Sequence, residues 1–155
     1  MVSDERLIAV GISHRTAPLE VRERLSVPVD AIPGLLDRLR TDGFSDEAII
    51  LSTCNRTELY AVPGRRGDGG RLARWLAETG GATDRDVSNK IYRMSDQAAL
   101  RHIFRVASSL DSLVLGEPQI VGQLKTAYRV SAEHNAAGPL LHRVMNQALS
   151  VSKRV

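Results

Sequence analysis

The one cysteine of the chain, Cys54, lies in a polar run, STCNRTE at residues 52–58, that directly follows an apolar segment. Packing alone would fill such a strand-to-strand corner with apolar residues. A thiolate is a nucleophile, and a nearby cation such as Arg56 favours the thiolate form. The planar guanidinium of Arg56 can instead grip a substrate carboxylate. Both roles predict an electrophilic substrate that carries a negative group.

The same residues also have purely structural interpretations, which the sequence leaves open. Free cysteines are often small buried hydrophobes, and Cys54 can be one of them. Asn55 is a common turn former, and Thr53 can simply end a strand.

Four histidines are candidates for proton transfer. His14 follows the first apolar segment, and His102 lies on a predicted helix. A lone histidine on a helix face is more often packed or solvated than catalytic, so both interpretations of His102 stay open. His134 and His142 flank the last loop, and we expect both to be exposed.

Polar residues also recur in SLDSLVLGEPQIVGQ at residues 109–123, which turns at its Gly-Glu-Pro. One interpretation is that these side chains cap the following helix. The other is that Ser112, Glu117, Gln119 and Gln123 surround a polar ligand. Composition does not decide between the two.

The elements that would position these residues alternate between strand and helix patterns. Apolar runs bounded by turn residues predict strands at Leu7–Ser13, Glu47–Ser52, Glu58–Val62 and Lys90–Met94. Helical periodicity predicts helices after Pro18, Asp30, Gly70, Ser95, Pro118 and Pro139. This order predicts an α+β domain: a small antiparallel sheet of about four strands covered by helices, ending in the start of a long helix.

Two helices carry more specific expectations. Asp30 is predicted to cap the helix that Gly43 ends. The last helix has an apolar stripe through Leu141, Val144 and Val151 that meets no Gly or Pro stop, so we expect it to continue beyond the chain. We expect the stripe to be partly exposed and able to associate.

Composition narrows the class of protein. The 155 residues, 43% hydrophobic and 25% charged, predict one globular domain. The net charge is +3, and the cations are nearly all arginine, which either reflects codon usage or serves phosphate or carboxylate binding. A single cysteine excludes an internal disulfide and a cysteine-rich zinc site. Without an apolar run of about 20 residues or a secretory signal, we expect a cytoplasmic protein with no membrane segment and no metal.

Three motifs, taken together, resemble one family. GISHRTAP at 11–18, LSTCNRTELY at 51–60 and SSLDSLVLGEPQIVGQLKTAY at 108–128 are similar, in order and spacing, to the N-terminal catalytic domain of glutamyl-tRNA reductase. The resemblance implies an NADPH-dependent reduction of glutamyl-tRNA(Glu) to glutamate-1-semialdehyde, a step of tetrapyrrole (porphyrin and heme) biosynthesis. In this family a cysteine attacks the aminoacyl ester, releases the tRNA and leaves a glutamyl thioester, which a hydride reduces.

The resemblance also implies roles for individual residues. Cys54 stands where the family keeps its nucleophile, and His102 aligns with a histidine that serves in proton transfer or in placing the attacked carbonyl. Arg56 is the expected clamp on a substrate carboxylate. The other implied substrate-binding residues are Thr53, Asn55, Ser112, Glu117, Pro118, Gln119 and Gln123.

The expected organisation is a catalytic domain at 1–137 followed by the start of a spinal helix at 138–155. No G-x-G-x-x-G follows a strand, so we expect the NADPH site to be absent from these residues. The fragment is then expected to lack reductase activity, to hydrolyse glutamyl-tRNA slowly and to be monomeric. The whole enzyme is expected to be a homodimer that has glutamate-1-semialdehyde aminotransferase as a partner.

Two other classes of protein remain open. A non-catalytic module that binds tRNA or a partner protein, with a structural thiol, predicts salt-sensitive binding. A thiol hydrolase of the Cys-His-Asn kind has less support, because no local signature of the known families surrounds Cys54.

Overall fold

Four strands form one antiparallel sheet in the spatial order β2-β3-β1-β4. The strands are β1 (Ile8–Ser13), β2 (Ser45–Ser52), β3 (Arg56–Pro63) and β4 (Tyr92–Ser95). Each lies within a few residues of its predicted position. The computed structural model describes residues 5–81, 87, 89–109 and 118–152 of the chain.

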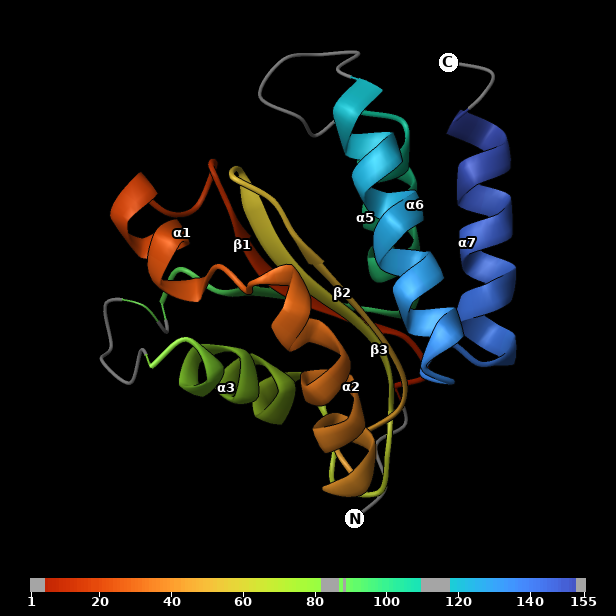
Figure 1. Cartoon of the computed structure of the whole chain (residues 1–155), viewed down its shortest axis with the longest axis horizontal. Helices are drawn as coiled ribbons and strands as arrows, with labels where there is room; N and C mark the ends of the chain where they lie inside the picture. The colour runs from red at the N-terminus through yellow and green to blue at the C-terminus, as the bar shows by residue number, and fades with distance from the viewer. Residues whose placement is uncertain (1–4, 82–86, 88, 110–117, 153–155) are drawn as a thin grey trace.

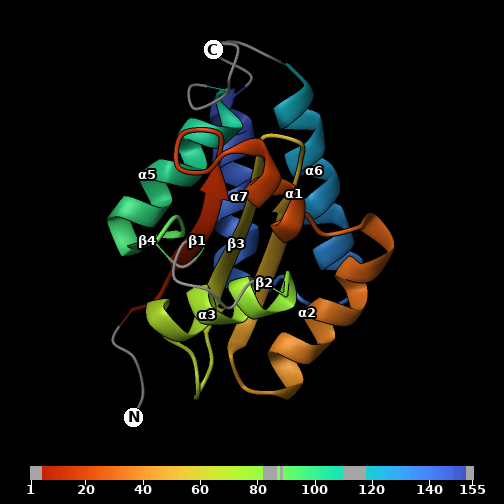
Figure 2. The same cartoon turned by 90° about the vertical axis from the view of Figure 1, so that its left-hand side faces the viewer.

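Helices cover both faces of this sheet (Figure 1). They are α1 (Leu19–Leu25), the short 3₁₀ turn η1 (Val29–Ala31), α2 (Ile32–Thr41), α3 (Gly69–Thr79), α5 (Asp96–Ala107), α6 (Pro118–Glu133) and α7 (Pro139–Ser152). The first three α-helices lie on one face and the last three on the other, as Figure 2 also shows. The predicted fold class is confirmed.

Alternation along the strands makes both faces of the sheet apolar, and each face packs against helices. Val10 of β1 and Leu59 of β3 point towards α2 and α3 and pack there. Their neighbours Ala9 and Tyr60 point the other way and pack against α5, α6 and α7. The sheet is therefore buried on both faces, and a polar residue inside it must find partners within the protein.

The expected role of Asp30 is wrong, because Asp30 lies within η1 and α2 begins only at Ile32, without a side-chain cap. Pro33 supports this helix start instead, since its fixed φ suits the first turn. Gly43 follows the end of α2 with a φ of 79°, as a helix-ending glycine is expected to.

The apolar stripe of α7 is not an exposed surface. Leu141 and Val144 are 0% and 4% exposed and belong to the core shared with α5 and α6, whereas Val151 is 37% exposed. The expected exposure of Leu141 and Val144 is therefore wrong, because the domain itself supplies the surface that covers them. None of the described helices is long and apolar enough to cross a bilayer.

Glu47 of β2 fixes the start of α7. Its carboxylate accepts hydrogen bonds from the backbone N–H groups of Gly138 (2.9 Å), Leu140 (3.3 Å) and Leu141 (2.8 Å). A Cβ on Gly138 would lie 2.7 Å from Glu47 Cδ, so only glycine permits this approach. A side chain of the sheet thus acts as the N-terminal cap of α7.

Replacing Glu47 by alanine should lower the free energy of unfolding by about 1–2 kcal/mol, because helix donors lose their acceptor and the helix dipole loses a negative charge. Urea denaturation measures this change. Asp46→Ala removes an exposed carboxylate of the same strand and should have little effect. Equal destabilisation by the two substitutions would contradict the capping role of Glu47.

Candidate functional site

Cys54 lies at the tip of the turn that joins β2 to β3, and it is exposed. The Thr53 N–H donates to the Arg56 carbonyl at 2.8 Å. Thr53 Oγ1 accepts from the backbone N–H groups of Asn55 (3.1 Å) and Arg56 (3.2 Å), which closes the turn locally. The interpretation of Cys54 as a buried hydrophobe is therefore wrong, whereas Thr53 does have a structural role.

The segment after β1 holds the backbone of this turn from outside. The His14 N–H donates to the Asn55 carbonyl at 2.8 Å. Arg22 of α1 donates through Nη1 to the Cys54 carbonyl at 3.0 Å and to Asn55 Oδ1 at 3.5 Å, and through Nε to Ala17 O at 3.2 Å. Two of the sequence motifs therefore meet at the thiol. Nothing in the sequence pattern indicates this role of Arg22, because an arginine on a short helix normally faces solvent.

A buried carboxylate, Glu58, lies four positions after the thiol. Arg56, Glu58 and Tyr60 alternate along β3 and so share one face of the sheet. Arg56 Nη1 is 3.5 Å from Glu58 Oε2, and the Tyr60 hydroxyl donates to Oε1 at 2.5 Å. His102 Nε2 of α5 is 2.5 Å from Oε2, and the Tyr92 hydroxyl of β4 also donates to Oε2. We call these five residues the Glu58 cluster.

Gly11 of β1 makes room for the cluster. It pairs with Glu58 of β3 on one side and with Tyr92 of β4 on the other. A Cβ on Gly11 would lie 2.5 Å from Thr57 O and 2.8 Å from Glu58 Cγ. The missing side chain therefore leaves the space in which Glu58 and Tyr92 meet across the central strand.

The charges of the cluster compensate each other. Burial raises the pKa of Glu58, but the hydrogen bond and positive charge of His102 and the charge of Arg56 together hold that pKa below its ordinary value of 4.5. Burial, and then the negative charge of Glu58, raise the pKa of Tyr60 well above 10. Near neutral pH, Glu58 is thus a carboxylate and Tyr60 a hydrogen-bond donor.

Sequence reasoning placed Arg56 and His102 in the site but missed the residues between them. His102 reaches Arg56 through Glu58, and its ring also lies 5.6 Å from that of Tyr92. A usable signal was present in β3, where the charged residues Arg56 and Glu58 occur at alternate positions of a strand whose second half is apolar. Nothing in the sequence pointed to Tyr92.

The other expected substrate-binding residues lie elsewhere or outside the described residues. Gln119 and Gln123 are exposed on α6 and line, together with Ser52 of β2, a groove of about 540 Å³. Ser112 and Glu117 lie outside the described residues. Pro118 begins α6, and its side chain is likewise outside the described part. The structure thus places the two glutamines beside the strand that leads to Cys54.

The other two candidate histidines, His134 and His142, belong to the region of α6 and α7. His134 follows α6 and is exposed, as expected. His142 of α7 is only partly exposed, and its Nδ1 is 2.6 Å from the Tyr128 hydroxyl, so its expected exposure is wrong. Packing of α7 against α6 brings these two side chains together.

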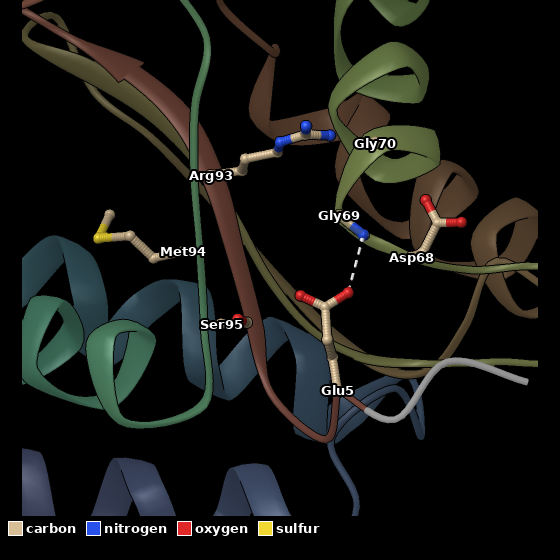
Figure 3. Close-up of a pocket in the computed structure, with 7 residues that line it drawn as sticks. All are labelled: Glu5, Asp68, Gly69, Gly70, Arg93, Met94 and Ser95. Carbon is tan, nitrogen blue, oxygen red and sulfur yellow. Dashed lines mark hydrogen bonds between the residues drawn. The ribbon is translucent and has the colours of Figure 1, made fainter.

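A separate pocket of about 460 Å³ lies at the start of α3 (Figure 3). Asp68 caps the helix by accepting from the Arg71 N–H at 2.8 Å, and Glu5 accepts from the Gly69 N–H at 3.4 Å. Arg93 extends from β4 towards the same helix turn in Figure 3. Two carboxylates of the chain itself therefore already accept from N–H donors at the start of α3.

Known proteins are similar in sequence to this chain over nearly its whole length. The family model described as glutamyl-tRNAGlu reductase, N-terminal domain, matches residues 10–155. The chain belongs to this family. The predicted resemblance to glutamyl-tRNA reductase is confirmed.

Relatives and a solved structure agree with the family model. The chain is 47% identical over 149 residues to a glutamyl-tRNA reductase of Marinobacter nauticus. It is 45% identical over 150 residues to a glutamyl-tRNA reductase of Synechococcus. Each alignment covers 96% of this chain and 34% of the relative. The structure of glutamyl-tRNA reductase from Methanopyrus kandleri matches with a TM-score of 0.77 at 30% identity, over 97% of this chain and 34% of that one. The chain thus spans about a third of the length of these glutamyl-tRNA reductases.

The described sheet is not arranged like the usual dinucleotide-binding fold. That fold requires parallel strands joined by a helix, with a glycine-rich turn between the first strand and the helix. Every strand pairing in the described sheet is antiparallel.

Substituting alanine for Gly11 should destabilise the protein by about 1–3 kcal/mol, because the added Cβ collides with the backbone of β3 and displaces Glu58. Urea denaturation provides the measurement. Gly34→Ala is the matched control, since no atom lies within 4 Å of its Cβ position and alanine favours the interior of α2. A Gly11 variant as stable as the wild type would contradict the role assigned to this glycine.

The lowered pKa of Glu58 should make stability depend on pH. Because the folded pKa lies below the unfolded value of 4.5, the contribution of Glu58 is complete above pH 4.5 and is lost as the pH falls through the folded pKa. The difference in unfolding free energy between wild type and Glu58→Gln should therefore shrink on acidification from pH 7.

Urea denaturation at a series of pH values tests this expectation. Asp46→Asn, at an exposed position, controls for the loss of one carboxylate. A wild-type advantage over Glu58→Gln that stays constant down to pH 3 would show that the charge of Glu58 is not stabilising.

Proposed function

We propose that this chain is the catalytic domain of an NADPH-dependent glutamyl-tRNA reductase, an enzyme of tetrapyrrole biosynthesis, and that Cys54 is its nucleophile. The observation that carries the proposal is the exposed thiol at the tip of a turn whose backbone is held by Thr53, His14 and Arg22. A thiol needed only for packing would be buried. A fixed and accessible thiol suits attack on a substrate carbonyl.

The step assigned to this chain is transfer of the glutamyl group. The Cys54 thiolate attacks the ester carbonyl of glutamyl-tRNA(Glu), a carbon–sulfur bond forms, and the carbon–oxygen bond to the terminal ribose breaks. The ribose oxygen takes a proton as the tRNA leaves, and a glutamyl thioester remains. Residues of this chain therefore account for capture of the glutamyl group and not for its reduction. In the absence of a hydride donor, water would hydrolyse the thioester and make the chain a slow esterase.

The Glu58 cluster is proposed to position Arg56 beside the thiol. Arg56 is the proposed clamp on a carboxylate of the substrate. Its side chain is 1% exposed, so a substrate reaches the guanidinium only after a rearrangement. For His102 we propose the role of placing the substrate, because its Nε2 is engaged by Glu58, which in turn holds Arg56.

The other parts of the proposal rest on membership of the glutamyl-tRNA reductase family. Residues 1–137 form the catalytic domain, and 138–155 begin the spinal helix of a longer, homodimeric and cytoplasmic enzyme. Its product passes to glutamate-1-semialdehyde aminotransferase. The proposed substrate contacts, besides Cys54 and Arg56, are Thr53, Asn55, Ser112, Glu117, Pro118, Gln119 and Gln123.

Release of glutamate from glutamyl-tRNA without NADPH tests the nucleophile. The wild-type chain should discharge the tRNA, and Cys54→Ser or alkylation of Cys54 should reduce the rate to that of uncatalysed hydrolysis, because the thioester cannot form. Ser52→Ala, a change to the same hairpin that leaves the thiol in place, should retain most of the activity. Unfolding curves of all variants exclude loss of fold.

The same assay distinguishes the alternative class of protein. Equal discharge by the wild type and Cys54→Ser would exclude Cys54 as the nucleophile. Salt-sensitive tRNA binding by a chain that shows no thiol-dependent discharge would instead support a binding module with an inert thiol.

A further inference from the structure

A cleft lined mainly by charged side chains lies at the end of the sheet opposite Cys54. Its volume is about 500 Å³. The arginines that line it are Arg38 of α2, Arg66 of the connection after β3, and Arg71 and Arg74 of α3. We call it the arginine cleft. In Figures 1 and 2, the end of α2 and the helix α3 lie away from the β2–β3 turn.

The arginine cleft concentrates positive charge. All four arginines are exposed, and two acidic residues, Asp42 and Glu78, share the lining, which leaves a formal charge of +2. The whole chain of 155 residues carries +3. Like charges gathered in one concave surface raise the local concentration of anions.

Two of the guanidinium groups have partners, and two are available. Arg66 Nη1 donates to the Asp42 carbonyl at 3.3 Å, and Arg71 Nη1 donates to the Arg66 carbonyl at 3.2 Å. The side chains of Arg38 and Arg74 make no hydrogen bond or ion pair with another described residue. Each therefore has its full set of donors free for a phosphate group, which a guanidinium can bind through two parallel N–H groups.

Aromatic residues add planar surfaces beside these cations. The guanidinium carbon of Arg66 lies 5.4 Å from the centre of the Phe44 ring, and Trp75 is partly exposed in the same lining. Proteins bind RNA with arginines on phosphates and with aromatic or guanidinium planes against bases. This combination favours RNA over a small carboxylate or a protein partner.

The distance from Cys54 requires an extended ligand. β2 has 8 residues between the connection after α2 and the turn that carries the thiol. At about 3.3 Å per residue its length is about 26 Å. A ligand whose reactive end lies at Cys54 and whose phosphates lie in the arginine cleft must be a polyanion of at least this reach.

We infer that the arginine cleft binds the phosphate backbone of the RNA whose aminoacylated end reacts at Cys54. The inference rests on the proposed function for its choice of RNA. It adds a second contact area, remote from the thiol, through which the protein holds the body of its substrate.

Binding of uncharged tRNA to the full 155-residue chain tests the inference without any chemistry at Cys54. The double variant Arg38→Glu, Arg74→Glu should bind at least about tenfold more weakly, and its plot of log affinity against log salt should be less steep by about 1.5, for two lost phosphate contacts. The charge-preserving variant Arg38→Lys, Arg74→Lys should keep the steeper slope.

A matched control places the same change of charge on the opposite face of the sheet. Arg129→Glu, Arg143→Glu alters exposed arginines of α6 and α7 and should bind tRNA nearly as the wild type does. Equal weakening by the cleft and control variants would overturn the inference, and so would unchanged binding by the cleft variant.

A short substrate separates this inference from the proposed function. The glutamyl ester of adenosine cannot reach the arginine cleft, so the cleft variant should discharge it at the wild-type rate while discharging glutamyl-tRNA more slowly at limiting concentration. Equal loss with both substrates would overturn the inference. Cleft-dependent tRNA binding by a chain whose thiol is inert would support the arginine cleft as an RNA-binding surface and contradict the proposed nucleophile.

Discussion

The carboxylate of Glu58 imposes the main physical constraint on this domain. A charge at 1% exposure is very costly unless it is paired and hydrogen-bonded. The partners come from three directions: Arg56 and Tyr60 from the same strand, Tyr92 from β4 and His102 from α5. The need to pair this carboxylate therefore fixes the register of β3 and β4 against β1 and the position of α5. Gly11 of β1 is required for the same reason, because the Glu58 side chain lies where a Cβ on Gly11 would be.

The turn that carries Cys54 is held at one end by the Glu58 cluster and at the other by α1 and the segment after β1. Arg56 ends the turn and begins the strand that carries Glu58, while Arg22 and the His14 backbone bind the other side of the turn. A thiol at the tip of a hairpin would normally be mobile, since loops fluctuate more than the elements they connect. Here hydrogen bonds from outside the hairpin hold its backbone, which suits a nucleophile that must meet a carbonyl in a defined orientation.

The two ends of the sheet differ in chemistry. At one end lie the thiol and the buried ionic cluster, where polar groups have partners within the protein. At the other end lie exposed arginines, two of which have no described partner for their side chains. The first arrangement favours chemistry on one small group, and the second favours electrostatic contact with an extended anion. A substrate with a small reactive end and a large polyanionic body fits both.

The sequence by itself determined the strands, most helices, the α+β class and the family, because apolar periodicity and local motifs are properties of neighbouring residues. It also placed Cys54, Arg56 and His102 among the site candidates. Only the tertiary structure decided that Glu58 joins Arg56 to His102 and that Tyr92 completes the cluster, since these contacts link residues up to 44 positions apart. Burial likewise depends on which other elements cover a side chain. The fold leaves Cys54 exposed and covers Leu141 and Val144. Apolar periodicity alone cannot distinguish a helix stripe in the core from one on the surface.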